Sequence, residues 1–176
     1  MRHAGARPTH DRPPEATLYT ILVVTELPLT EHDVSRVAAL HGDEQVRAHV
    51  LVPADTEHSR VLEALDEAAL GKLREAFDDS DDAAPADAEL AAQHAVNVSV
   101  DALTKAGVEA TGAVTADNPV PAAVEAVTAL PADEVIVVTP PHLIEETLRR
   151  DWASRLRDKA GRPVLHFVAG TDRVVS

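Results

Sequence analysis

Residues 134–139 read EVIVVT, a run of β-branched and apolar residues that ends abruptly at Pro140 and Pro141. A run of this kind, without polar alternation, is typical of a strand buried on both faces of a parallel sheet. Residues 19–25 read YTILVVT and carry the same signal. The two stretches therefore predict two interior strands, around which the rest of the chain can be assigned.

The remaining strands and helices are predicted to alternate along the chain. Three further short apolar runs predict strands. They lie at residues 46–52, just before Pro53, at residues 108–115, and at residues 163–168, which begin with Pro163. Apolar residues at helical spacing predict helices at residues 30–41, 58–77, 87–107, 118–130 and 143–160. Because right-handed crossover helices pack back onto a sheet, this alternation predicts an α/β fold with a doubly wound parallel sheet of five strands.

Local signals set the limits of this fold. Residues 1–17 mix Arg, His and Pro with small residues without periodicity, so we expect a disordered tail before a single domain at residues 18–176. The acidic stretch at residues 78–86 is expected to form an exposed loop. Thr30 and Asp33 have the spacing of a capping box at the start of the first helix.

Composition excludes several classes of function. The chain has no cysteine, which removes disulfides and thiolate ligands, and its nine histidines show no metal-ligand spacing, so no metal site is expected. Its net charge of -14 repels nucleic acid. No apolar run approaches the length of about 18 residues that a membrane helix needs. Since residues 1–17 also lack the hydrophobic stretch of a signal peptide, we expect a cytoplasmic protein without membrane contact.

In a doubly wound sheet, a ligand site lies beyond the carboxyl ends of the strands, where the winding reverses. Those ends are expected to gather Thr25, Glu26, Thr139, Pro140 and His142. Two interpretations stay open: Glu26 and His142 form an acid and base pair for proton transfer, or both are ordinary polar residues at strand ends. No nucleophile elbow, Walker loop or dinucleotide-binding glycine motif is present, so the sequence gives no support for an enzyme.

The last predicted helix carries four arginines, Arg149, Arg150, Arg155 and Arg157. Converging arginines form a clamp for an anion, whereas dispersed ones form the solvated face of an amphipathic helix. The sequence leaves both interpretations open.

Four segments in this order resemble the universal stress protein family. They are ILVVTE at residues 21–26, ADNP at residues 116–119, ADEVIVV at residues 132–138 and PVL at residues 163–165. The likeness covers residues 18–168. It implies a Rossmann-like sheet in the strand order 3-2-1-4-5, frequent dimerisation, and a role in stress survival that is usually regulatory rather than enzymatic.

The glycine motif of the family's ATP-binding members is missing from this chain. Those members end the first strand with an aspartate, and their G-x2-G-x9-G-[ST] motif after the fourth strand supplies backbone N–H groups and a hydroxyl to the phosphates. This chain has Glu26 in place of the aspartate, no glycine at residues 134–160, and Arg150 and Asp151 where the final pair falls. The resemblance, with this departure, implies a regulatory or interaction module without a cofactor. The alternatives are ATP or another adenine nucleotide held by the arginines, or a small-molecule sensor or enzyme at the ends of the two interior strands.

The last predicted strand suggests how the chain assembles. The strand follows a proline and contains no acidic, lysine or arginine residue, so an exposed edge at this position would invite pairing. We expect a homodimer across this edge, the mode that the resembled family often uses, and a protein partner that the sequence does not identify. The alternative is a monomer in which residues 169–176 fold over the edge. The expected interface consists of Val164, Leu165, His166, Phe167 and Val168.

Overall fold

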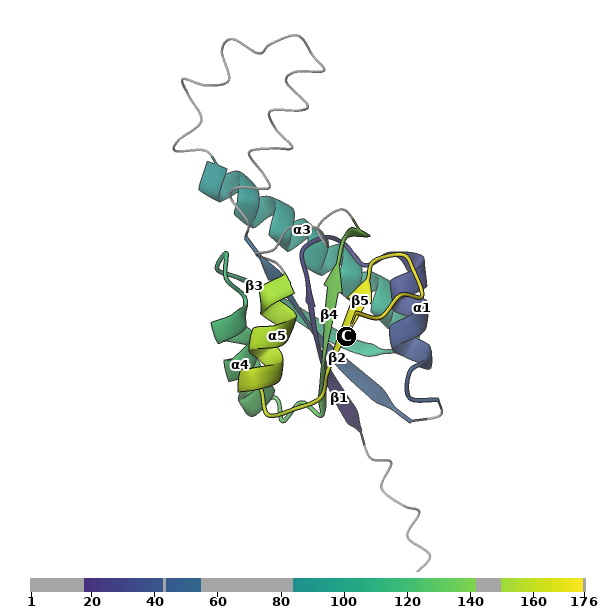
Figure 1. The fold of residues 1–176 in the computed structure, drawn as a ribbon. Helices are drawn as coiled ribbons and strands as arrows, with labels where there is room; N and C mark the ends of the chain where they lie inside the picture. The colour runs from purple at the N-terminus through teal and green to yellow at the C-terminus, as the bar shows by residue number, and fades with distance from the viewer. Residues whose placement is uncertain (1–17, 43, 55–83, 142–149, 176) are drawn as a thin grey trace, which may run out of the picture.

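A computed structural model of the chain describes residues 18–42, 44–54, 84–141 and 150–175. Within them, five parallel strands form one sheet in the order β3-β2-β1-β4-β5 (Figure 1). The α/β class and the strand order 3-2-1-4-5 are therefore confirmed. The strands are β1 (Tyr19–Thr25), β2 (Val46–Pro53), β3 (Glu109–Thr115), β4 (Glu134–Thr139) and β5 (Val164–Val168). The helices are α1 (Glu31–Ala39), α3 (Ala84–Lys105), α4 (Val120–Ala129) and α5 (Arg150–Lys159).

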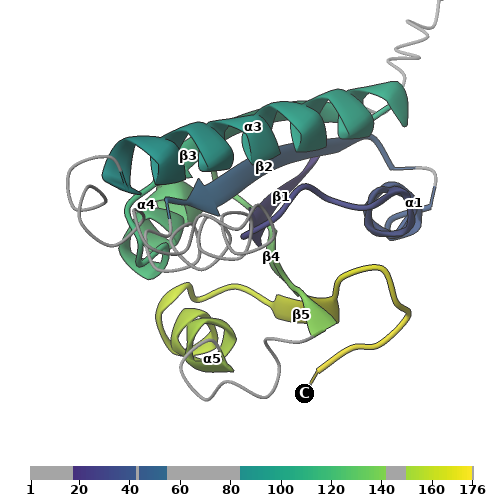
Figure 2. The same ribbon diagram turned by 90° about the horizontal axis from the view of Figure 1, so that it is seen from above.

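The sheet is covered by helices on both faces, as a nearly continuous apolar strand requires. Val23 of β1 lies between Val50 of β2 and Ile136 of β4. Odd-numbered apolar residues of β1 join a core with α1 and α3, and even-numbered ones join a second core with α4 and α5. Figure 2 shows these two pairs of helices on opposite sides of the sheet. Within the described ranges, no helix is both long enough and apolar enough to cross a membrane.

The first helix begins at the capping box that the sequence predicts. The Asp33 N–H donates to Thr30 Oγ1 at 3.2 Å, and the Thr30 N–H donates to Asp33 Oδ2 at 3.0 Å. Asp33 is completely buried, and its second oxygen, Oδ1, accepts the N–H of Gly170 at 2.9 Å. Asp33, which completes the capping box of α1, therefore also fastens the C-terminal segment to the domain.

Several helix boundaries differ from the sequence-based expectation, among them the starts of α3 and α4. α3 begins at Ala84 rather than Asp87, so residues 84–86 of the expected acidic loop are helical. Pro85 is compatible with a first helical turn, where its missing N–H is not needed. α4 begins at Val120, two residues after the expected start. The expected tail at residues 1–17, the helix at 58–77, the acidic residues 78–83 and the first part of the last helix, 143–149, lie outside the described residues.

The outer side of β5 is the edge where the homodimer is expected. Phe167 forms an antiparallel bridge with Val174, so the end of the chain turns back along this strand (Figure 1). Phe167 and Val168 are buried, while Val164 and Leu165 are half-buried. The folding of the chain end over the edge, which the sequence left as the alternative, is thus what the chain adopts by itself. The homodimer stays a prediction.

Candidate functional site

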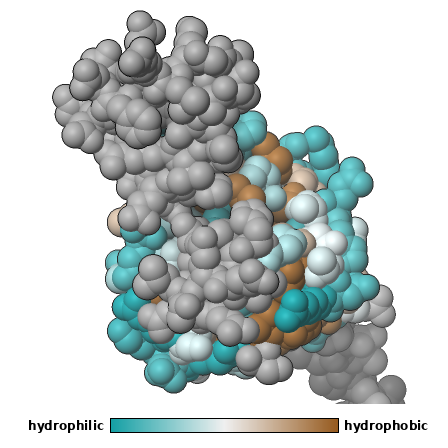
Figure 3. All heavy atoms as spheres, turned by 45° about the horizontal axis from the view of Figure 1, so that its top comes forward, coloured by the Kyte–Doolittle hydropathy of each residue, from teal (hydrophilic) through white to brown (hydrophobic). Residues whose placement is uncertain are grey.

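The carboxyl ends of β1 and β4 meet at one end of the sheet, because the two strands are parallel neighbours. Thr25 pairs in register with Val138, so Glu26 and Thr139 follow side by side at the rim. The structure therefore brings together four of the residues expected there, Thr25, Glu26, Thr139 and Pro140. Figure 3, which turns this end toward the viewer, shows a largely hydrophilic described surface with smaller hydrophobic areas.

The two residues at the end of β1 are shielded from solvent. Thr25 is 3% exposed, and its hydroxyl donates to the carbonyl of Leu27 at 2.9 Å, which fixes the turn after the strand. Both carboxylate oxygens of Glu26 are buried.

At the end of β4, the hydroxyl of Thr139 is engaged with an imidazole of the neighbouring strand. Thr139 Oγ1 and His166 Nε2 lie 2.8 Å apart, and both residues are 3% exposed. The pair follows from register, because His166 lies opposite Val137 and therefore on the same face as Thr139. Sequence analysis placed His166 in a dimer interface and missed this contact. The signal that could have indicated this contact is the alternation of side chains between the two faces of the sheet, which puts every second residue of β4 and of β5 on the same face.

The other expected site residues fall partly outside the structure. His142 and Arg149 lie outside the described residues, and Arg150 is the first residue of α5. The acid and base pair of Glu26 with His142, and the arginine clamp, therefore stay hypotheses. Pro140 is buried directly after β4, where its ring nitrogen has no proton to donate.

The amino end of α4 lies at the same side of the sheet, because this helix follows the carboxyl end of β3. Backbone N–H groups at a helix start are the usual donors to an anion. The Val120 N–H already donates to Asn118 Oδ1 at 3.2 Å. Pro119 and Pro121 have no N–H to offer. The helix start is therefore poor in free donors.

A second polar cluster lies at the opposite end of the sheet and was not anticipated from the sequence. Glu134, at the start of β4, has a side chain 8% exposed, and its Oε2 lies 3.2 Å from His41 Nε2. The rings of Tyr19 and His41 lie with their centroids 3.8 Å apart and their planes tilted by 34°. The cluster joins the start of β1, the start of β4 and the residues after α1.

Burial determines the protonation behaviour of this second cluster. It raises the pKa of the Glu134 carboxyl, and the neighbouring His41 imidazole offsets part of that rise. Burial also raises the pKa of Tyr19, helped by the negative charges of Glu134, Asp133 and Glu44. Among the neighbouring groups, His41 does most to favour the ionised form of the Glu134 carboxyl. Among the described residues, no group of three or more His, Asp or Glu side chains is arranged to hold a metal ion.

Comparison with known proteins identifies the fold. No protein-family model and no curated protein sequence matches the chain. Among solved structures, the hypothetical protein MJ0577 is similar with a TM-score of 0.53 at 16% identity, covering 87% of this chain and 97% of that one. The universal stress protein from Archaeoglobus fulgidus in complex with dAMP is similar with a TM-score of 0.50 at 14% identity, covering 86% and 98%. The five-stranded α/β fold of this chain is thus the universal stress protein fold.

Proposed function

We propose that this chain is a universal stress protein-like module that regulates or binds another protein in a stress response, in the cytoplasm. It does not bind ATP in the manner of the family's glycine-motif members. The fold likeness supports the first part of the proposal, and the chemistry at the ends of β1 and β4 supports the second. An enzymatic role has no support from the described residues.

The observation that carries the proposal is that the hydroxyl of Thr139, the last residue of β4, is already in contact with another side chain. Thr139 Oγ1 is buried and already lies 2.8 Å from His166 Nε2. The next two residues are prolines, and the amino end of α4 is short of free N–H groups. Triphosphate binding depends on converging backbone donors.

Thermal unfolding with adenine nucleotides tests the proposal. We expect no rise in the melting temperature with ATP and Mg2+, AMP, dAMP or cyclic AMP. A ligand at a hundred times its Kd stabilises a protein by about 2.7 kcal/mol, which raises Tm by about 5–11 °C for a domain of this size. A rise of that size with ATP would contradict the proposal.

An adenine nucleotide bound by different contacts is the second candidate function. It is favoured by the similarity to a universal stress protein in complex with dAMP. The chain lacks glycine donors, so the phosphate contacts would come from arginine side chains. If a nucleotide raises Tm, the variants Arg149→Ala and Arg150→Ala should abolish the rise. A rise that persists in both variants would exclude the arginine clamp.

A homodimer across the outer edge of β5 is the assembly that we propose. The strand carries no Lys, Arg, Asp or Glu, the residues that commonly protect such an edge. An isologous contact of two copies would extend the sheet through backbone hydrogen bonds.

A further inference from the structure

The outer edge of β5 is occupied at its carboxyl end by residues 169–175, which we call the edge cap. The Val168 N–H donates to the carbonyl of Arg173 at 3.1 Å, and the Val175 N–H donates to the carbonyl of His166 at 2.8 Å. Around these bonds, Phe167 and Val174 form an antiparallel bridge. In Figure 2 the chain leaves β5, swings toward α1 and returns to end near the strand. The edge therefore accepts an antiparallel strand, and the chain supplies that strand itself.

The cap begins with a turn that only glycine adopts readily. Gly170 has φ +67°, and its N–H donates to Asp33 Oδ1 at 2.9 Å. Arg36 Nη1 of the same helix donates to the carbonyl of Thr171 at 2.7 Å. α1 thus holds the turn through a buried carboxylate and a guanidinium.

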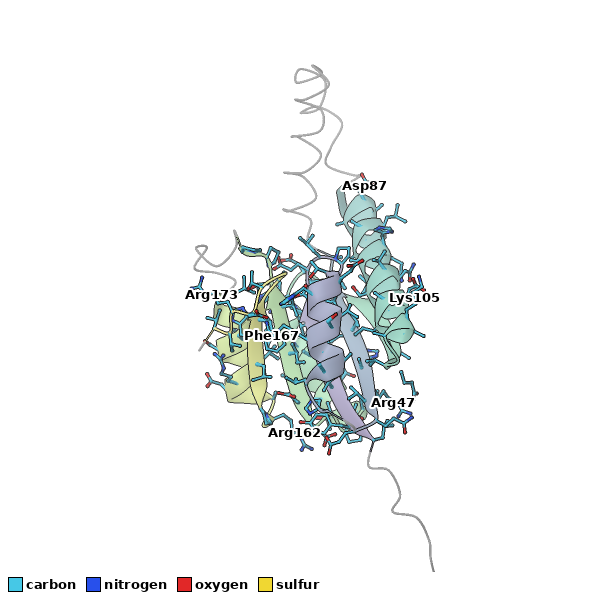
Figure 4. The ribbon with its side chains drawn as sticks, turned by 90° about the vertical axis from the view of Figure 1, so that its right-hand side faces the viewer. Arg47, Asp87, Lys105, Arg162, Phe167 and Arg173 are labelled. Atoms are coloured by element: carbon cyan, nitrogen blue, oxygen red, sulfur yellow. The ribbon has the colours of Figure 1, made fainter. Side chains whose placement is uncertain are left out.

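Further contacts hold the cap from both faces of the sheet. His32 Nε2 of α1 lies 3.0 Å from Asp172 Oδ1. Arg157 Nη2 of α5, on the other face, donates to the carbonyl of Val175 at 3.2 Å. Figure 4 labels Phe167 of β5, whose ring centroid lies 3.7 Å from the guanidinium carbon of Arg36 on α1, and Arg173 of the cap beside β5. The cap is a specified structure, because its turn at residues 170–172 is bonded to α1 and its last described residue is bonded to α5.

The backbone groups that the cap uses are those that a second strand needs. The Pro163 carbonyl and the Ala169 N–H form their hydrogen bonds with β4. Backbone groups alternate in direction along a strand, so the N–H and C=O groups of residues 164, 166 and 168 are directed away from β4, toward the open edge. The cap takes the His166 carbonyl and the Val168 N–H. A second copy of β5 therefore cannot pair along residues 166–168 of this edge while the cap is in place.

We propose that the edge cap is an autoinhibitory segment that controls pairing of β5 with a second copy of this chain. The inference rests on the proposed homodimer and adds its control: the closed cap holds the chain as a monomer, and an opened cap releases the edge. Since both copies must open, weakening the cap acts twice on the dimer. The apparent Kd of the dimer is inversely proportional to the square of the fraction of chains whose cap is open, because both chains must be open to pair.

A matched pair of glycine variants tests the control. An added Cβ meets nothing nearer than 3.9 Å at Gly170 and nothing within 4 Å at Gly107, which has φ +87° and lies between α3 and β3. Alanine in a left-handed conformation is disfavoured roughly tenfold, so Gly170→Ala should open each cap about tenfold more often. We expect the dimer Kd, measured by analytical ultracentrifugation, to fall up to about a hundredfold in Gly170→Ala and to stay unchanged in Gly107→Ala.

Two further measurements separate pairing from control. Val175→Pro removes the N–H that bonds His166, and it should strengthen the dimer as Gly170→Ala does. Hydrogen exchange of the Val168 amide should accelerate in the monomer of Gly170→Ala. Val164→Lys places a charge at the start of the strand, outside the part that the cap covers, and should abolish the dimer in every background. Because Val164 also packs against the core with α4 and α5, a cooperative thermal unfolding of this variant is required as its folding control.

The outcomes distinguish the inference from the homodimer on which it rests. If Gly170→Ala and Val175→Pro leave Kd unchanged while Val164→Lys abolishes the dimer, the pairing stands and the controlling role of the cap is wrong. If no variant dimerises at the highest concentration that the protein tolerates, the homodimer itself is wrong and the inference falls with it.

Discussion

Replacement of Gly112 by alanine should destabilise the domain, because β3 and α3 meet at this residue without room for a side chain. A Cβ there would lie 2.8 Å from Val96 Cγ1 on α3 and 2.9 Å from the backbone oxygen of Val50 on β2. Gly112 is not among the residues with positive φ, so space rather than backbone conformation requires the glycine.

Two opposing effects set the magnitude. Forcing a methyl group into a contact without room for it costs about 1–3 kcal/mol, whereas replacing glycine within a strand by alanine gains about 0.5–1 kcal/mol. The methyl group of Val96 can rotate away, but the Val50 oxygen is fixed by the pairing of β2 with β3. We therefore expect a net loss of about 1–2 kcal/mol in the free energy of unfolding, or roughly 2–8 °C in Tm.

Urea unfolding of Gly112→Ala, Val96→Ala and the double variant measures the effect. The double variant should lose less than the sum of the single variants, because Val96→Ala removes one of the two clashing groups. Ala113→Val is the control, since residue 113 is exposed and should tolerate the change within about 0.5 kcal/mol. If Gly112→Ala leaves the free energy of unfolding unchanged or raises it, the close approach of α3 to β3 is refuted.

Two other predictions concern buried polar groups. Because burial raises the pKa of Glu134 above 4.5, its ionised form costs stability that its neutral form does not, so stability is lost as pH rises through the folded-state pKa. Glu134→Gln should therefore raise Tm at pH above that pKa and lose the advantage on acidification; a gain independent of pH would contradict this. Thr139→Val should cost about 1–3 kcal/mol in urea unfolding, since it removes a buried hydrogen bond to His166. Thr111→Val removes the exposed bond to His49, also 2.8 Å long, and should cost clearly less; equal costs would mean that burial is not the cause.

The strands were predictable because their signals are local. The runs at residues 19–25 and 134–139 coincide with β1 and β4. β-branched apolar residues favour extended backbone wherever both faces of a strand are buried, and this preference is visible in the run itself. The capping box of Thr30 and Asp33 is likewise a local pattern, and it forms as the spacing indicated.

The candidate site was predicted less well, because its contacts depend on register. The sequence correctly placed Thr25, Glu26 and Thr139 at one rim, since parallel neighbours end at the same side. It did not indicate that the Thr139 hydroxyl is taken by His166, 27 positions along the chain. A shift of one residue between β4 and β5 would turn His166 to the other face, and nothing in either strand alone fixes that register.

The sequence by itself thus determined the class of the fold and the strands of the sheet, because each strand is written in consecutive residues. Tertiary structure decided which polar groups meet. The buried Asp33 bonds Gly170 near the other end of the chain, and Glu134 at the start of β4 meets His41 after α1. It also decided that the edge of β5 is covered by the chain's own end. These contacts join residues far apart in sequence, so they exist only once packing has fixed the position of each helix and strand.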